Sequence, residues 1–228
     1  SHPRPGEVSL AHHGVLFLDE LPEFRRNVLE VLRQPLEDGV VTVSRAALSL
    51  SFPARFTLLA AMNPCPCGYL GDPRRDCLCS PERVRGYRGR LSGPLYDRID
   101  LHVRVAAVPW QDLSSPTSGE LSVAVRRRVA AARERQRVRS AGPGRPGPNL
   151  NSSLSGSALE QHCRPDADGR RLLGSAMNRL GWSARGYARV LRVARTIADL
   201  AGEDRVSARQ VAEALQYRAY EARHQHEG

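Results

Sequence analysis

Two apolar runs, each of which ends in polar residues, constrain the fold of this chain most. Residues 15–18 (VLFL) end at Asp19 and Glu20, and residues 56–61 (FTLLAA) end at Met62 and Asn63. Short continuous apolar runs are typical of strands buried on both faces of a parallel sheet. The long crossover between the two runs is also typical of such a sheet. The sequence therefore predicts an α/β fold class.

The crossover contains two patterns. Pro22 stands where a first helical turn tolerates proline, and apolar residues at helical spacing follow it over residues 24–36. From Val40 to Phe52 apolar and polar residues alternate on both sides of a tip at residues 44–47. We therefore expect one helix packed beside the sheet, followed by a β-hairpin with Arg45 at its tip.

The rest of the chain changes from mixed to helical. A cysteine-bearing loop at residues 64–81 precedes a strand-like segment at residues 99–105, and residues 118–139 have helical spacing. A Gly/Pro-rich stretch follows at residues 140–148, and everything after it has helical character, including a clear helix at residues 183–201 with an arginine face. We therefore divide the chain into an α/β core (1–110), a basic helix with a linker (111–150) and an all-α domain (151–228).

Composition excludes some classes of protein. Apolar residues make up 41% of the 228 residues, and no apolar run approaches the roughly 18 residues of a membrane span, so we expect no membrane partner. The net charge of +10 favours a polyanion such as nucleic acid. However, every basic residue is arginine, so many of them can simply be solvated. The start lacks both a signal peptide and an initiator methionine, so we expect an internal cut of a longer protein. Clustered cysteines without a secretory signal favour a reducing cytoplasm over a disulfide framework.

Asp19 and Glu20 are the first candidates for chemistry. Parallel sheets bind ligands beyond the carboxyl ends of their strands. There, Asp19 would hold Mg²⁺, and Glu20 would deprotonate the water that attacks a γ-phosphate. The alternative for both is an acidic N-cap of the following helix.

Asn63 and Arg98 extend this candidate site. Asn63 would bond the γ-phosphate or the lytic water, or else it caps a loop. Arg98 would reach the γ-phosphate bound by a neighbouring subunit as an arginine finger. Its alternative is a surface ion pair with Asp97 or Asp100.

Four cysteines lie within fifteen residues, Cys65, Cys67, Cys77 and Cys79. A tetrahedral Zn²⁺ would supply the folding energy that their Pro/Gly-rich loop lacks. Unliganded or redox-responsive thiols are the alternative, because one residue within each pair is a tighter spacing than usual. Cys163 is expected to be an ordinary packed side chain.

Several segments together carry a family resemblance: GEVSLAH at residues 6–12, GVLFLDELPEF at 14–24, AAMNPCPCG at 60–68 and DRIDL at 97–101. They resemble the ComM/YifB group of magnesium-chelatase-like AAA+ proteins, and the similarity extends from about residue 3 to residue 218. The NPCPCG segment is much more specific than the Asp-Glu pair.

The resemblance implies a hexameric AAA+ ATPase that uses ATP and Mg²⁺. It makes Asp19 and Glu20 the Walker B pair, Asn63 sensor 1, Arg98 the finger and Arg185 sensor 2. It also implies that the sheet is part of a larger AAA+ core and that the all-α domain is its lid.

The same resemblance leaves several functions open. The hairpin resembles the pre-sensor-1 hairpin of helicases, so Arg45 would contact a DNA backbone; an exposed turn arginine is the alternative. The leading function is an ATP-driven DNA motor of the helicase or branch-migration type. There are two alternative functions. One is a chelatase-type subunit that remodels a protein, and the other is a truncated module that does not hydrolyse ATP. The family's phosphate-binding loop with its lysine is absent from these residues, so we expect this chain alone to be inactive.

Overall fold

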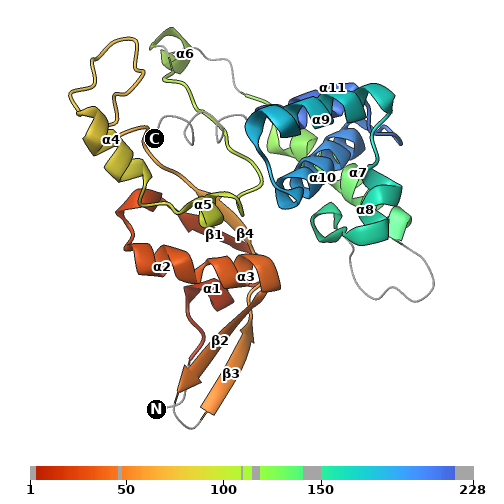
Figure 1. The fold of residues 1–228 in the computed structure, drawn as a ribbon, viewed down its shortest axis with the longest axis horizontal. Coiled ribbons are helices and arrows are strands. Elements are labelled where there is room, and N and C mark those ends of the chain that lie inside the picture. Colours follow the sequence, from red (N-terminus) through yellow and green to blue (C-terminus); the bar gives the residue numbers. More distant parts are fainter. Residues whose placement is uncertain (1–3, 46–47, 109, 115–118, 141–149, 219–228) are drawn as a thin grey trace. The chain divides into compact units, whose positions relative to one another are not determined.

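The computed structural model describes residues 4–45, 48–108, 110–114, 119–140 and 150–218. The chain forms two compact units, Ser1–Ile99 and Asp100–Gly228, which are described separately. Their order of elements is a small parallel sheet with a hairpin and short helices, followed by a helical unit (Figure 1). This is the predicted fold class, a partial AAA+ α/β core followed by a helical lid.

The first unit contains α1 (Glu7–Leu10), β1 (Val15–Leu18), η1 (Leu21–Glu23), α2 (Arg26–Val31), α3 (Arg33–Asp38), β2 (Val40–Arg45), β3 (Leu48–Pro53), β4 (Thr57–Ala60), α4 (Pro81–Arg88) and α5 (Gly93–Tyr96). Both predicted buried runs are strands. β1 and β4 pair in parallel with Val15 opposite Thr57 and Leu18 opposite Ala60.

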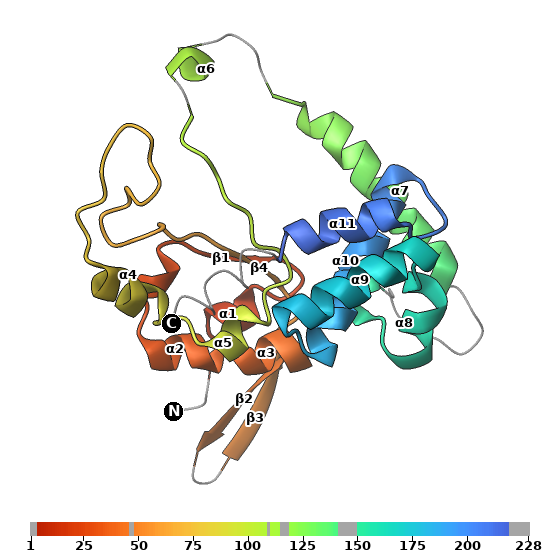
Figure 2. The same ribbon diagram turned by 45° about the horizontal axis from the view of Figure 1, so that its top comes forward.

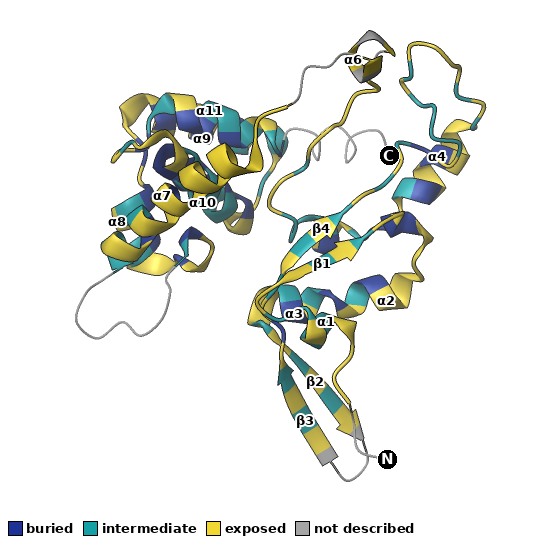
Figure 3. Cartoon of the chain, turned by 180° about the vertical axis from the view of Figure 1, so that it is seen from behind, coloured by how far each residue is buried: buried dark blue, intermediate teal, exposed yellow. Residues whose placement is uncertain are grey.

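The two faces of this sheet differ. On one face, Leu16, Leu18 and Ala60 pack against a core formed by α2, α3, α5 and the segments next to them: Leu21, Leu29, Leu32, Leu91 and Leu95. On the other face Val15 is 61% exposed, and Phe17 and Leu59 are each 56% exposed. Figure 3 shows exposed residues along both β1 and β4. The prediction of strands buried on both faces was therefore wrong, because the described helices pack against one face only.

The single helix predicted to begin near Pro22 and to continue through residues 24–36 is broken into η1, α2 and α3. The break falls at Leu32, and Pro35 follows inside α3. A proline lacks the backbone N–H that would bond the carbonyl four residues earlier, and its ring clashes with that carbonyl. Pro35 therefore separates α2 from α3.

The predicted hairpin is present. β2 and β3 pair antiparallel from Val40 opposite Pro53 to Arg45 opposite Leu48. The hydroxyl groups of Thr42 and Ser51 lie 3.0 Å apart across the strands. The predicted tip residues 46 and 47, and the Arg45 side chain, lie outside the described part of the chain.

The second unit contains α6 (Trp110–Ser114), α7 (Ser122–Ser140), η2 (Asn151–Ser153), α8 (Gly156–Cys163), α9 (Ala167–Leu180), α10 (Ala184–Ala201) and α11 (Ala208–Gln216). α10 packs against α7, α8 and α11 (Figure 2). Its apolar face supplies Val190, Leu191, Ala194 and Ala198 to the core. The division of the chain at residues 110 and 150 stays a prediction.

The strand-like segment at residues 99–105 forms no strand. A strand needs a neighbour for its backbone groups, whereas His102 donates its backbone N–H to the carbonyl of Tyr217 beyond α11, at 2.9 Å. That expectation was wrong. In the described part of the chain, no helix is both long and apolar enough to span a membrane.

Candidate nucleotide-phosphate edge and cysteine cluster

The parallel pairing brings the candidate phosphate-site residues to one edge of the sheet. Asp19 and Glu20 follow β1 directly, and Asn63 follows β4 by three residues. Backbone hydrogen bonds continue beyond the strands, from Ala61 N to the Leu18 carbonyl and from Leu21 N to the Ala61 carbonyl, each at 2.9 Å. All three candidate residues are exposed at this edge.

The backbone of Glu20 is strained. Its φ of 49° and ψ of 44° lie in the left-handed region, which few residues other than glycine adopt. Asp19 Oδ1 accepts a hydrogen bond from Glu20 N at 2.8 Å, and the Glu20 side chain makes no capping bond to η1. The simple N-cap alternative therefore does not explain this pair, and strain of this kind clusters at functional sites.

Helix α4 supports the segment around Asn63. The Tyr87 hydroxyl forms a hydrogen bond with the backbone of Asn63. Burial raises the pKa of Tyr87, whereas this hydrogen bond lowers it. Arg88 Nε donates to the Pro64 carbonyl at 3.1 Å. Two side chains of α4 therefore hold the backbone on either side of the Asn63–Pro64 peptide.

Arg98 is held within its own unit. Its guanidinium forms an ion pair with Glu37 of α3, and Nη1 donates to the Pro94 carbonyl at 2.7 Å. The Arg98 side chain is 9% exposed. An ion pair was the expected alternative, but the partner is Glu37 rather than Asp97 or Asp100. Action on a neighbouring subunit would require this pair to open.

Arg185 is the second residue of α10 and is exposed. Ser183 caps this helix by accepting a hydrogen bond from Gly186 N. The other members of the predicted arginine face are engaged: Arg189 pairs with Asp100, and Arg192 Nε donates to the Leu154 carbonyl at 2.8 Å. Arg189 and Arg192 are therefore held by contacts within the helical unit.

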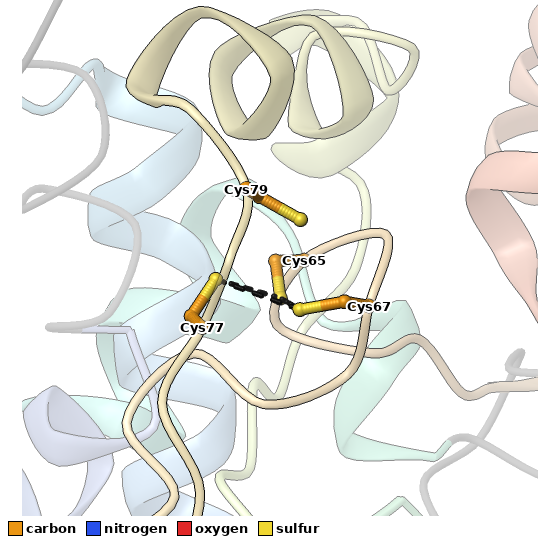
Figure 4. Close-up of side chains that lie close together, drawn as sticks. All are labelled: Cys65, Cys67, Cys77 and Cys79. Atoms are coloured by element: carbon orange, nitrogen blue, oxygen red, sulfur yellow. Dashed lines mark hydrogen bonds between the residues drawn. The ribbon is translucent and has the colours of Figure 1, made fainter.

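Four cysteine thiols converge between β4 and α4 (Figure 4). The Sγ of Cys65 lies 3.3 Å from that of Cys67 and 3.6 Å from that of Cys77, and all four sulfurs lie within 4.8 Å of one another. All four are free thiols, and Cys65 is buried. The arrangement can hold a metal ion.

The thiols differ electrostatically. A backbone hydrogen bond at Tyr69 is the main cause that lowers the pKa of Cys67 to about 6. Burial and the neighbouring Cys67 raise the pKa of Cys79. One thiolate therefore forms easily, and further negative charge is opposed. Cys163, by contrast, is part of the core of the second unit, where burial raises its pKa to about 11.

Sequence comparisons match this order of features. The family model described as magnesium chelatase, subunit ChlI, matches residues 1–113, and the model for the ChlI C-terminal part matches residues 119–218. Competence protein ComM of Haemophilus influenzae is 47% identical over 95% of this chain and 41% of that protein. The chain belongs to the magnesium-chelatase-like AAA+ family.

Two further relatives show the breadth of this family. The uncharacterized protein YifB of Escherichia coli K12 is 44% identical over 95% of this chain and 41% of that protein. Magnesium-chelatase subunit ChlI-1 of Arabidopsis thaliana is 29% identical over 48% of this chain and 20% of that protein. The chain thus spans about two fifths of the length of its ComM and YifB relatives.

The sequence did not identify the residues that contact the candidate site residues Arg98 and Asn63. Glu37 lies 61 positions from Arg98, and nothing in the local pattern links the two. Tyr87 looks like an ordinary amphipathic-helix residue. Both supporting contacts are non-local, so only the fold identifies them.

Proposed function

We propose that this chain is the Walker-B-to-lid part of an ATPase that couples ATP hydrolysis to DNA remodelling. The observation that carries the ATPase proposal is the shared edge of β1 and β4, where Asp19, Glu20 and Asn63 are exposed together. The carboxylate oxygens of this edge suit Mg²⁺, a hard cation that prefers oxygen ligands. Bound Mg²⁺ would neutralise charge on the phosphates of ATP.

In this proposal each residue has a separate task. Asp19 holds the Mg²⁺, directly or through water, and Glu20 accepts a proton from the attacking water. The Asn63 amide orients that water or the γ-phosphate. Arg98 and Arg185 supply positive charge, the first to an adjacent subunit of a homo-oligomeric ring, which we propose to be hexameric.

The proposed active site needs a phosphate-binding loop in addition to these residues. No lysine occurs among the 228 residues, so the lysine of such a loop is not among them. We therefore propose that the isolated chain does not hydrolyse ATP and that activity belongs to the longer protein, acting in the cytoplasm.

Two observations support DNA as the partner. The hairpin ends at Arg45, and the chain carries a net charge of +10. Arginine and hydroxyl side chains bind phosphate groups without reading sequence. A chelatase-type subunit that remodels a protein is the second candidate, and the similarity to ChlI-1 over about half of this chain favours it.

The Walker B assignment is tested by Glu20→Gln in the full-length protein. The substitution removes the base and keeps the shape, so turnover should fall by about 10²–10⁴-fold while ATP binding persists. Glu23→Gln is the matched control, since Glu23 pairs with Arg90 at 2.9 Å and has no proposed task. Equal turnover in Glu20→Gln and wild type would refute the assignment.

The partner is tested by measuring ATPase rates with and without single-stranded or forked DNA. Stimulation by DNA that Arg45→Ala loses, and that Arg171→Ala keeps, supports the DNA motor. Arg171 is exposed on the helical unit and pairs with Asp168, which makes it a suitable control. Hydrolysis that does not respond to DNA would favour the chelatase-type function instead.

A further inference from the structure

The loop at residues 64–80 is ordered without a hydrophobic core of its own. It contains no helix or strand, none of its residues belongs to either core cluster, and its Leu78 is 91% exposed. Nevertheless four cysteines from both ends of the loop meet, and Cys65 is 0% exposed. Convergence of four thiols in a loop without apolar packing indicates that a ligand stabilises it.

The distances between the sulfurs fit a tetrahedral metal centre. Four ligands at about 2.3 Å from Zn²⁺ lie about 3.8 Å from one another. In the structure the Sγ atoms lie 3.3 Å apart for Cys65 and Cys67, and 3.6 Å apart both for Cys65 and Cys77 and for Cys67 and Cys77. A disulfide would require about 2.05 Å between two sulfurs, so the cluster is a set of thiols.

We propose that Cys65, Cys67, Cys77 and Cys79 bind one Zn²⁺ that fixes the loop between β4 and α4. Thiolates are soft ligands, and four of them in a tetrahedron select zinc or iron over Mg²⁺ or Ca²⁺. The closed set of four protein ligands leaves no open position for a substrate. The site is therefore structural and separate from the Mg²⁺ site proposed at Asp19.

The proposed metal site lies next to the proposed phosphate site at Asp19, Glu20 and Asn63, because two of its cysteines lie near the two ends of the segment from Asn63 to α4. Cys65 follows Asn63 by two residues, and Cys79 directly precedes Ser80, whose hydroxyl caps α4 by accepting from Arg83 N at 3.3 Å. The other end of α4 contacts Asn63 and Pro64 through Tyr87 and Arg88. One zinc ion thus closes a ring of contacts that positions Asn63; the value of this positioning for catalysis rests on the proposed function.

Metal analysis of the purified chain tests the site without any activity measurement. We expect one zinc per chain, and replacement by Co²⁺ should give the visible absorption of a tetrahedral cobalt–thiolate centre. Cys67→Ser and Cys77→Ser should lose the metal, whereas Cys163→Ser should keep it, because Cys163 packs in the core of the second unit. Iron in place of zinc, or metal contents that do not differ between these variants, would overturn the proposal.

Because the serine variants can fail to fold, the wild-type chain is also compared before and after removal of the metal by a chelator. Hydrogen exchange should accelerate at residues 63–80 and in α4, stay constant in α10 and recover when Zn²⁺ is added. Exchange that does not respond to the metal would refute the positioning role. Neither measurement depends on ATP, so a failed ATPase assignment would leave the zinc result standing.

Discussion

A buried ionic network in the helical unit predicts that one substitution lowers the free energy of unfolding by a large amount. The Asp199 carboxylate on α10 is 0% exposed and pairs with Arg139 of α7 and with Arg195, whose side chain is 1% exposed. It also accepts from Asn151 Nδ2 at 2.8 Å. The isosteric change Asp199→Asn leaves two buried cations without their counter-charge. Removal of one partner from a buried pair costs about 3–5 kcal/mol.

Urea unfolding of the 228-residue chain measures this loss. Both tryptophans, Trp110 and Trp182, lie in the helical unit, and Trp182 packs against its core, so tryptophan fluorescence reports on this unit. With a urea dependence of about 2 kcal/mol per M, the midpoint should fall by about 2 M.

The control is Asp204→Asn. The Asp204 side chain is 93% exposed and pairs with Arg135 at 2.8 Å, and an exposed pair contributes about 0–1 kcal/mol. Its midpoint should therefore hardly move. Equal, small shifts in both variants would show that the buried charges are compensated in another way, which would refute the reasoning.

Two further predictions concern a helix and the finger candidate. Gly169→Ala in α9 should lose about 1–3 kcal/mol through overpacking, because the new Cβ would lie 2.8 Å from Pro165 Cβ; Gly174→Ala, with nothing within 4 Å, should gain about 0.5–1 kcal/mol. The same urea titration distinguishes them, and a shift of the same sign in both would contradict the packing argument. In the full-length protein, Arg98→Ala should lower ATP turnover by about 10³-fold or more, whereas Glu37→Ala should retain turnover, because it only removes the intra-unit partner of Arg98. An equal loss in both variants would show that the ion pair, and not a finger, matters.

The sequence predicted the elements that depend on local patterns. The runs that became β1 and β4 are apolar except for Thr57 and end in polar residues, so both the strands and their common edge could be inferred. The break at Leu32 could also have been predicted from the sequence, because Pro35 lies inside the predicted helix. It was missed because the apolar spacing continues past the proline.

Features that depend on distant neighbours could not be predicted in this way. Leu101, Val103 and Val105 alternate as in a strand, yet they are 49%, 67% and 86% exposed, and none of the described strands pairs with them. Alternation shows only that a segment could join a sheet. Likewise Phe17 belongs to an apolar run, but the covering of its face depends on what packs there.

The buried network was missed for a different reason. Arginine and aspartate on a helix usually indicate a solvent-exposed face. Arg195 and Asp199, however, lie one turn apart on the buried side of α10. An oppositely charged pair four positions apart within an apolar face is itself a signal, because neither charge is buried readily without the other. This spacing could have identified the pair before the structure did.

The edge at which Asp19, Glu20 and Asn63 lie, the proposed phosphate site, depends above all on the register of β1 against β4. Each residue advances a parallel strand by about 3.3 Å, so a slip of two residues would keep the same face buried and move Asn63 by about 6.6 Å relative to Asp19. That distance exceeds the reach of a shared hydrogen-bonded water. The register is held by backbone bonds at both ends of the pair, from Thr57 N to the Gly14 carbonyl at 3.0 Å and from Ala61 N to the Leu18 carbonyl at 2.9 Å. The contacts of α4 with Asn63 and Pro64 are made to backbone atoms beyond a strand whose position is already fixed. In the proposed function they therefore hold the segment that carries Asn63, whereas the strand register brings this segment to the edge.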